Sequence, residues 1–158
     1  MKKRRITIKK GLFIFVICLS FFSCLSFPSS NGYKSMPEQP VQYSVVTNSV
    51  EVSIDKVLDD DIANQILSIC ESYYPDLKKE NPLILDIFVT QRSYFYDVSQ
   101  RNSIFVNYTL TDSSNKTIIR EDFSYETKKT VVSGREQYKI AKKIKKNIDK
   151  FLKAAQKV

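Results

Sequence analysis

Hydrophobic and polar residues alternate in four separate stretches of this 158-residue chain. Alternation with a period of two is typical of a β-strand that has one buried face. The pattern predicts strands at about residues 50–54, 83–90, 104–110 and 119–125, the second with an extension toward Tyr96. Polar residues at 99–102 and 112–116 predict turns, and Asn115 suits a left-handed backbone.

Two other stretches have the three-and-four spacing of amphipathic helices. The first follows Asp59, Asp60 and Asp61, which supply an N-cap and negative charge at the positive end of the helix dipole. Pro75 ends it. The second covers about residues 135–157, and its apolar stripe consists of Ile140, Ala141, Ile144, Ile148, Phe151, Leu152 and Ala155.

The predicted order of elements is β-α-β-β-β-α. Short turns between consecutive strands produce an antiparallel meander, and two amphipathic helices can cover its apolar face. We therefore predict an α+β domain at residues 41–158, with an antiparallel sheet of about four strands and two helices packed on one face. This order of a hairpin and a C-terminal helix is similar in pattern to small envelope lipoproteins of the transport-auxiliary type.

The N-terminal segment has the pattern of a secretory signal. Six basic residues lie within positions 2–10, and an almost wholly apolar run follows at residues 12–22. Ser23 and Cys24 then resemble the lipobox of bacterial lipoproteins. Because Phe21 and Phe22 stand where a leucine and a small residue are usual, the box resembles the relaxed form found in spirochaete lipoproteins.

The resemblance implies that residues 1–23 are a signal peptide and that Cys24 is lipidated after cleavage. Residues 24–40 then form a flexible tether rich in proline, serine, glycine and asparagine. Two alternatives remain open: cleavage near Ser26 without lipidation, or retention of the 17-residue segment 11–27 as a membrane anchor. We expect a periplasm-facing protein of the cell envelope. The absence of aspartate after Cys24 favours the outer membrane over the inner one.

Charge is unevenly distributed along the chain. Removal of residues 1–23 lowers the 25 basic residues to 19 against 17 acids, so the net charge falls from +8 to about +2 and gives no reason to expect a nucleic-acid partner. Residues 135–158 nevertheless carry nine basic and two acidic residues. Six lysines in that region fall on one side of the predicted helix: Lys139, Lys143, Lys146, Lys150, Lys153 and Lys157.

These lysines have two interpretations. They form a solvated helix face that offsets an acidic body, or they contact anionic lipid headgroups or an acidic envelope protein. A second candidate partner surface is aromatic and lies on the polar side of the predicted sheet. It comprises Phe88, Tyr94, Tyr96 and Phe105. The alternative is that the tether, the chain near Tyr43 or a second copy of the chain covers these side chains.

The residues needed for common catalytic sites are scarce. The chain has no histidine, and Cys70 is the one cysteine beyond the lipobox; we predict that it is a buried, inert thiol. Glu121 and Asp122 are adjacent on a predicted strand and should point to opposite faces, which suits them poorly for joint acid–base catalysis. We expect no cofactor and no metal site.

The sequence therefore favours a membrane-anchored, non-enzymatic binding or assembly module. The alternative function is an accessory lipoprotein of a lipid or solute transport system, which should contain an apolar groove between its sheet and its helices. An enzyme of unfamiliar, carboxylate-based type is the third hypothesis, and a deep pocket with two convergent carboxylates would support it.

Overall fold

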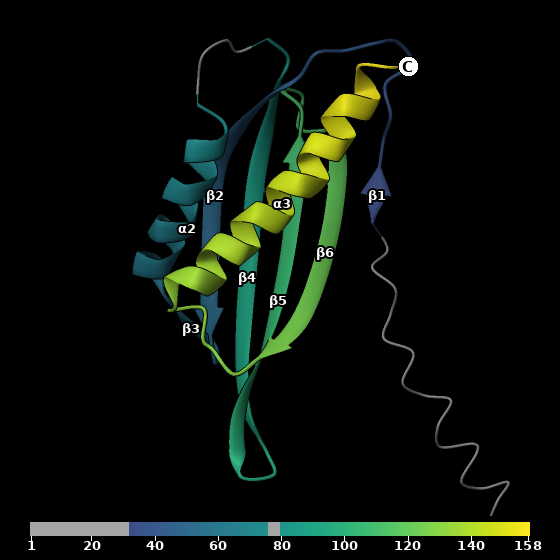
Figure 1. Ribbon diagram of the computed structural model, residues 1–158. Coiled ribbons are helices and arrows are strands. Elements are labelled where there is room, and N and C mark those ends of the chain that lie inside the picture. Colours follow the sequence, from purple (N-terminus) through teal and green to yellow (C-terminus); the bar gives the residue numbers. More distant parts are fainter. Residues whose placement is uncertain (1–31, 76–79) are drawn as a thin grey trace, which may run out of the picture.

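A six-stranded sheet carries two helices on one of its faces (Figure 1). The computed structural model describes residues 32–75 and 80–158. The strands are β1 (Tyr33–Lys34), β2 (Ser44–Ile54), β3 (Val57–Leu58), β4 (Pro82–Tyr96), β5 (Ser99–Thr111) and β6 (Thr117–Thr127), and the helices are α2 (Asp60–Tyr73) and α3 (Gly134–Ala155). The predicted α+β class and the two helices are confirmed.

The prediction of a wholly antiparallel sheet of about four strands is wrong. The sheet order is β1-β6-β5-β4-β2-β3, and β2 pairs with β4 in parallel. Helix α2 connects these two strands, and a crossover of this kind returns the chain to the end from which it started, so the two strands run in the same direction. The β4–β5–β6 meander is antiparallel, as predicted.

The predicted tether contains an ordered piece. Tyr33 and Lys34 form β1 on the edge of β6, and the Val41 N–H donates to the carbonyl of Ala155 over 3.1 Å. The prediction of a flexible segment as far as residue 40 missed this pairing because two residues are too few to show an alternating pattern. Residues 1–31, which include the signal peptide and Cys24, lie outside the described residues.

The predicted turn at residues 99–102 is also wrong. The chain reverses at Asp97 and Val98, where Asp97 has a φ of 56°, and β5 already begins at Ser99. Ser99 to Asn102 resemble a turn because they are polar, but they belong to a hairpin that projects from the sheet into solvent. The second turn is as predicted, with a φ of 62° at Asn115.

The core lies between the sheet and the helices. The Asp59 carboxylate caps α2 by accepting from the Ile62 N–H over 3.0 Å, as the sequence predicted. Helix α3 buries its whole predicted apolar stripe except Leu152, which is half-buried. This packing fixes the rotation of α3 and directs its lysines outward. No helix in the described part of the chain is both long and apolar enough to cross a membrane.

Candidate functional site

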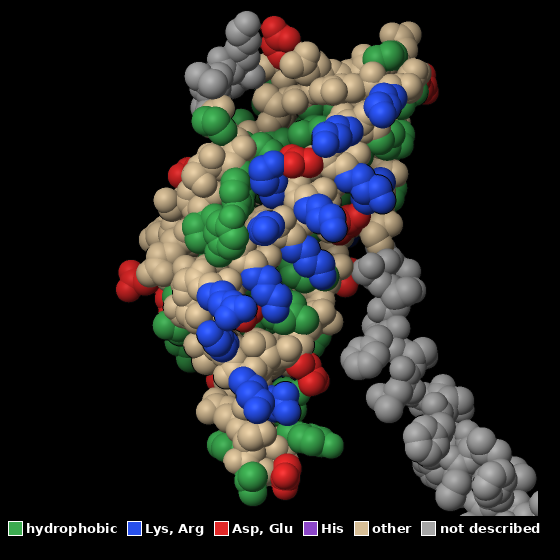
Figure 2. Space-filling model, in the orientation of Figure 1, with side chains coloured by type: hydrophobic (Ala, Val, Ile, Leu, Met, Phe, Trp, Pro, Cys, Tyr) green, Lys and Arg blue, Asp and Glu red, His purple; other side chains and the backbone are tan. Residues whose placement is uncertain are grey.

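The exposed side of α3 is a continuous cationic surface. Because the apolar stripe is buried, the six lysines singled out in the sequence all lie on the outside of the domain. Figure 2 shows the basic side chains as a band that follows the helix across the molecule. Five of these lysines fall into two groups that differ in what they touch, and the sixth, Lys157, is exposed just beyond the C-cap of α3 at Gln156.

The proximal lysines, Lys139 and Lys143, contact their own domain. The Lys139 ammonium lies 3.8 Å from the centre of the Tyr125 ring, and that of Lys143 lies 4.0 Å from the centre of the Phe123 ring. Both rings belong to β6. Lys139 also lies 3.5 Å from the carboxylate of Glu136. Cation–π contacts of this kind stabilise the packing of the helix on the sheet.

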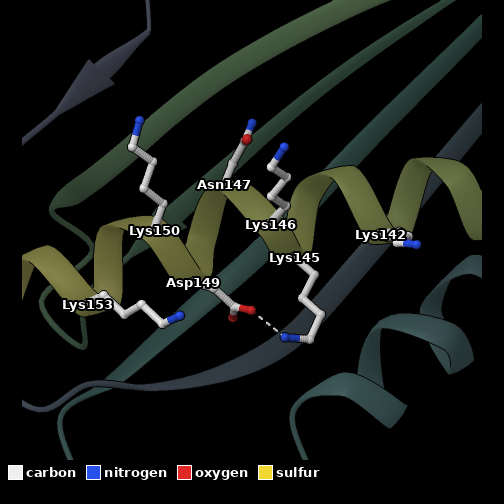
Figure 3. A pocket seen from close by; sticks show the side chains of 7 residues that line it. All are labelled: Lys142, Lys145, Lys146, Asn147, Asp149, Lys150 and Lys153. Carbon is white, nitrogen blue, oxygen red and sulfur yellow. Dashed lines mark hydrogen bonds and ion pairs between the residues drawn. The ribbon is translucent and has the colours of Figure 1, made fainter.

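The distal lysines, Lys146, Lys150 and Lys153, are different. Within residues 32–75 and 80–158, none of the three forms an ion pair with a carboxylate. Lys146 and Lys150 point to one side of α3, whereas Lys145 points to the other and pairs with Asp149 (Figure 3). The distal lysines therefore keep their positive charge available to another molecule.

A hollow of about 710 Å³ follows this part of the helix. Its lining consists of Lys142, Lys145, Lys146, Asn147, Asp149, Lys150 and Lys153. Five lysines and one carboxylate make the lining strongly cationic. Lysine ammonium groups on flexible stems attract phosphate and carboxylate groups without the fixed two-point geometry of arginine. The arrangement is suited to attracting an anionic group.

Glu121 is the centre of a polar cluster beneath α3. Its carboxylate accepts from the Tyr108 hydroxyl and, over 3.0 Å, from the Asn147 amide, and it pairs with Lys34 of β1. Partial burial acts to raise the pKa of Glu121, but the hydrogen bonds from Lys34, Tyr108 and Asn147 together hold it below its ordinary value. The cluster joins β1, β5, β6 and α3, so we assign it a structural role.

Sequence reasoning did not find this cluster, although one signal was present. Glu121 is in phase with Ile119 and Phe123 along its strand, which places it on the helix-covered side. Asp122 is exposed and pairs in register with Asn107. The two carboxylates thus point to opposite faces, as predicted, and do not form a pair.

The predicted aromatic surface is split in two by the structure. Phe88 and Phe105 are 44% and 46% exposed on the open face of the sheet, as diagonal neighbours across β4 and β5. Tyr94 and Tyr96 lie on the projecting hairpin, and Tyr94 is six residues from Phe88, or roughly 20 Å along the strand. Their role as a partner surface stays a prediction.

Cys70 is buried in α2, as predicted. Burial, together with the neighbouring charge of Glu71, raises the pKa of the Cys70 thiol to about 12. A thiol held neutral and away from solvent is a poor nucleophile and a poor metal ligand. Across the residues that the structure describes, no group of three or more histidine, cysteine or acidic side chains is placed to hold a metal ion.

Comparison with known proteins gives distant likenesses of shape alone. No family model and no curated protein matches the chain. A PelC dodecamer structure from Paraburkholderia phytofirmans is 13% identical, with a TM-score of 0.41 over 72% of this chain and 93% of that one. A neuraminyllactose-binding hemagglutinin homologue from Helicobacter pylori is 14% identical, with a TM-score of 0.44 over 79% and 95%. At these scores the likenesses support no statement about function.

Proposed function

We propose that this chain is a non-enzymatic binding module of the bacterial cell envelope. A lipid on Cys24 holds it to the periplasmic side of a membrane, with the outer membrane favoured, and the distal lysines of α3 capture an acidic envelope component. The observation that carries the proposal is the exposed row of Lys146, Lys150 and Lys153, whose charges meet no carboxylate in the described part of the chain.

The spacing of the distal lysines supports this role. Residues four and three apart on a helix are neighbours on its surface, so the three lysines occupy adjacent positions on one face of α3. Each lysine near an anionic surface contributes about 1 kcal/mol, and three acting together contribute about 3 kcal/mol. An attraction of this size supports a weak, reversible contact. The lipid anchor strengthens such a contact because it raises the local concentration of the module near its partner.

The length of the chain between Cys24 and the domain supports the anchoring part. Eight peptide units separate Cys24 from Gly32, where the described domain begins. Fully extended, they span about 29 Å at most. A lipidated chain would therefore keep its domain close to the membrane, because β1 is attached to the edge of β6.

The alternative function, an accessory lipoprotein of a transport system, requires an apolar groove between sheet and helices. In the described part of the chain, fully buried side chains such as Leu85, Ile87 and Ile144 occupy that space. The hollow beside α3 is lined by charged side chains. These observations favour binding of an anionic partner over transport of an apolar ligand.

Crosslinking in native membranes tests the proposal. The full-length chain is expected to carry a lipid on Cys24, seen by mass spectrometry, and to crosslink to a partner rich in acidic residues. The triple variant K146E/K150E/K153E should lose that adduct, whereas K139Q/K143Q should keep it. An unmodified Cys24 sulfur would contradict the anchor. An unchanged set of adducts from the triple variant would contradict the lysine contact.

A further inference from the structure

The hairpin of β4 and β5 extends beyond the rest of the sheet (Figure 1). On one side, β2 pairs with β4 only as far as Gln91. On the other, β6 pairs with β5 only as far as Asn102. Beyond both limits, β4 and β5 pair only with each other, up to Tyr96 opposite Ser99. The projecting arm ends at the turn of Asp97 and Val98.

The tip of this arm exposes large apolar side chains. Phe95 is 79% exposed, Tyr96 68% and Val98 93%. Phe95 and Tyr96 project from opposite faces of the arm and Val98 lies in its turn, so exposed apolar side chains surround the end of a narrow projection. A soluble protein usually scatters its exposed apolar residues, and a cluster of this kind marks a contact with a partner or a membrane.

Two fully buried polar side chains fix the base of the arm. Gln91 and Asn102 are each 1% exposed, and the Gln91 amide lies 3.4 Å from the Asn102 carbonyl oxygen. Gln91 accepts from the Val131 N–H over 2.7 Å, and Asn102 donates to the Lys129 carbonyl over 3.2 Å. Both partners lie in the loop that leads to α3. The arm is therefore braced by a satisfied buried network.

A second brace comes from the turn between β2 and β3. The Asp55 carboxylate accepts from the Ser93 N–H over 2.7 Å and from the Ser93 hydroxyl over 2.8 Å. These hydrogen bonds, the backbone one foremost, lower the pKa of Asp55. With both sides held, the arm presents its tip in a fixed direction.

The register of β1 shows which way this strand runs along the sheet. Tyr33 is opposite Arg120 and Lys34 is opposite Ile119, so the N-terminal end of β1 faces the Thr127 end of β6. Thr127 is opposite Asn102, at the base of the arm. From Asn102 to Val98 the arm extends roughly 13 Å further in that direction.

We propose that the tip formed by Phe95, Tyr96 and Val98 is a second membrane contact, inserted at the interface of the bilayer that anchors Cys24. The inference rests on the proposed function, since it places the membrane at the end where the anchored chain enters the domain. Aromatic rings with a polar group suit the boundary between headgroups and acyl chains. Asp97, at the turn, keeps the insertion shallow because a carboxylate stays in the headgroup water.

Charge at the base of the arm fits the same surface. Lys128 and Lys129 are exposed and directly follow the end of β6, where they can reach anionic headgroups. In this orientation α3 begins at the membrane end and the distal lysines lie at the other end of the helix. They then face away from the anchoring bilayer, toward a partner in the envelope space.

A single fluorophore tests the tip contact. The chain contains no tryptophan, so F95W places one at the tip, and F88W places the matched control on the open sheet face. Each full-length, lipidated variant is reconstituted into vesicles of anionic phospholipid that carry brominated acyl chains. The F95W variant should emit at shorter wavelength and be quenched, and the F88W variant should remain unquenched. Absence of quenching at position 95 would overturn the tip contact.

Removal of the anchor separates this proposal from the previous one. In the chain from residue 24 onward with C24A, which lacks both the lipid and the signal segment, vesicle binding by the intact tip should exceed that of F95S/Y96S/V98S by roughly tenfold or more, given the apolar area removed. Equal binding by the two would count against the tip. A chain that lacks the lipid on Cys24 yet shows quenching at position 95 would overturn the anchor and support the tip.

Discussion

The proximal and distal lysines of α3 differ in their surroundings. Lys139 and Lys143 lie over aromatic rings of β6. Further along the helix, β6 offers Glu121 instead, and Lys34, Tyr108 and Asn147 already occupy that carboxylate. The distal lysines therefore meet no local partner within the described chain. The contacts that the domain makes, and not the spacing of the lysines alone, decide which positive charges on α3 remain without a partner in the described chain.

The largest expected effect separates the two groups by binding. Neutralising all three distal lysines, in K146Q/K150Q/K153Q, removes about 3 kcal/mol of attraction, or roughly a hundredfold in affinity for an acidic polymer. Titration of the full-length chain with polyglutamate measures it at fixed, low salt, because screening weakens such contacts. The matched variant K139Q/K143Q should change the affinity by less than about threefold. If both variants lost the same affinity for polyglutamate, the proximal and distal lysines would not differ in their availability to an acidic partner.

The next effect concerns Glu121, the carboxylate that β6 presents to Asn147 in the distal part of α3. E121Q should lower the free energy of unfolding by about 1–3 kcal/mol, because it weakens hydrogen bonds to part-buried partners. Urea denaturation measures it, and D122N on the exposed face is the control, expected to stay within about 0.5 kcal/mol of the wild type. If D122N lowered the free energy of unfolding as much as E121Q does, the Glu121 cluster would have no special role in stability.

The same carboxylate predicts a pH dependence. Since the pKa of Glu121 in the folded protein lies below its ordinary value of 4.5, its contribution is fully present above that value. The contribution is lost as the pH falls through the lowered pKa. Wild type should therefore lose more stability than E121Q when the pH is taken from about 5 toward 2. Parallel stability curves for the two proteins would show that Glu121 does not titrate differently on folding.

The smallest effect again separates the lysines, this time by stability. K139Q and K143Q should each lower the free energy of unfolding by about 0.5–1 kcal/mol, because each removes a cation–π contact. K146Q and K150Q should stay within about 0.5 kcal/mol of wild type. Thermal and urea unfolding of the four single variants provide the comparison. Similar losses of unfolding free energy at proximal and distal positions would mean that the cation–π contacts do not stabilise the fold.

Sequence patterning predicted the elements whose period is long enough to be recognised. Helix α3, the cap at Asp59 and the β4–β5–β6 meander all followed from alternation or helical spacing. The parallel pairing of β2 with β4 did not, because local pattern does not fix which edge of a sheet a strand joins. Strand β1 was not predicted because a strand of two residues is too short to show an alternating pattern.

The site was predicted only in outline. The sequence placed the lysines on one side of α3, and Phe123 and Tyr125 on a strand. Whether an ammonium group lies over a ring depends on how the helix crosses the sheet, which spacing along the chain does not specify. The tip of the hairpin was missed because Ser99 to Asn102 are polar and resemble a turn, whereas the actual turn lies two residues earlier.

Site-specific crosslinking tests the central claim most directly. A photoreactive amino acid is placed at position 150 or at position 143 of the full-length chain in native membranes, and adducts are identified by mass spectrometry. If the distal lysines bind an acidic envelope component, position 150 should give an adduct with it and position 143 little or none. Equal yields at the two positions, or no adduct from position 150, would contradict that claim.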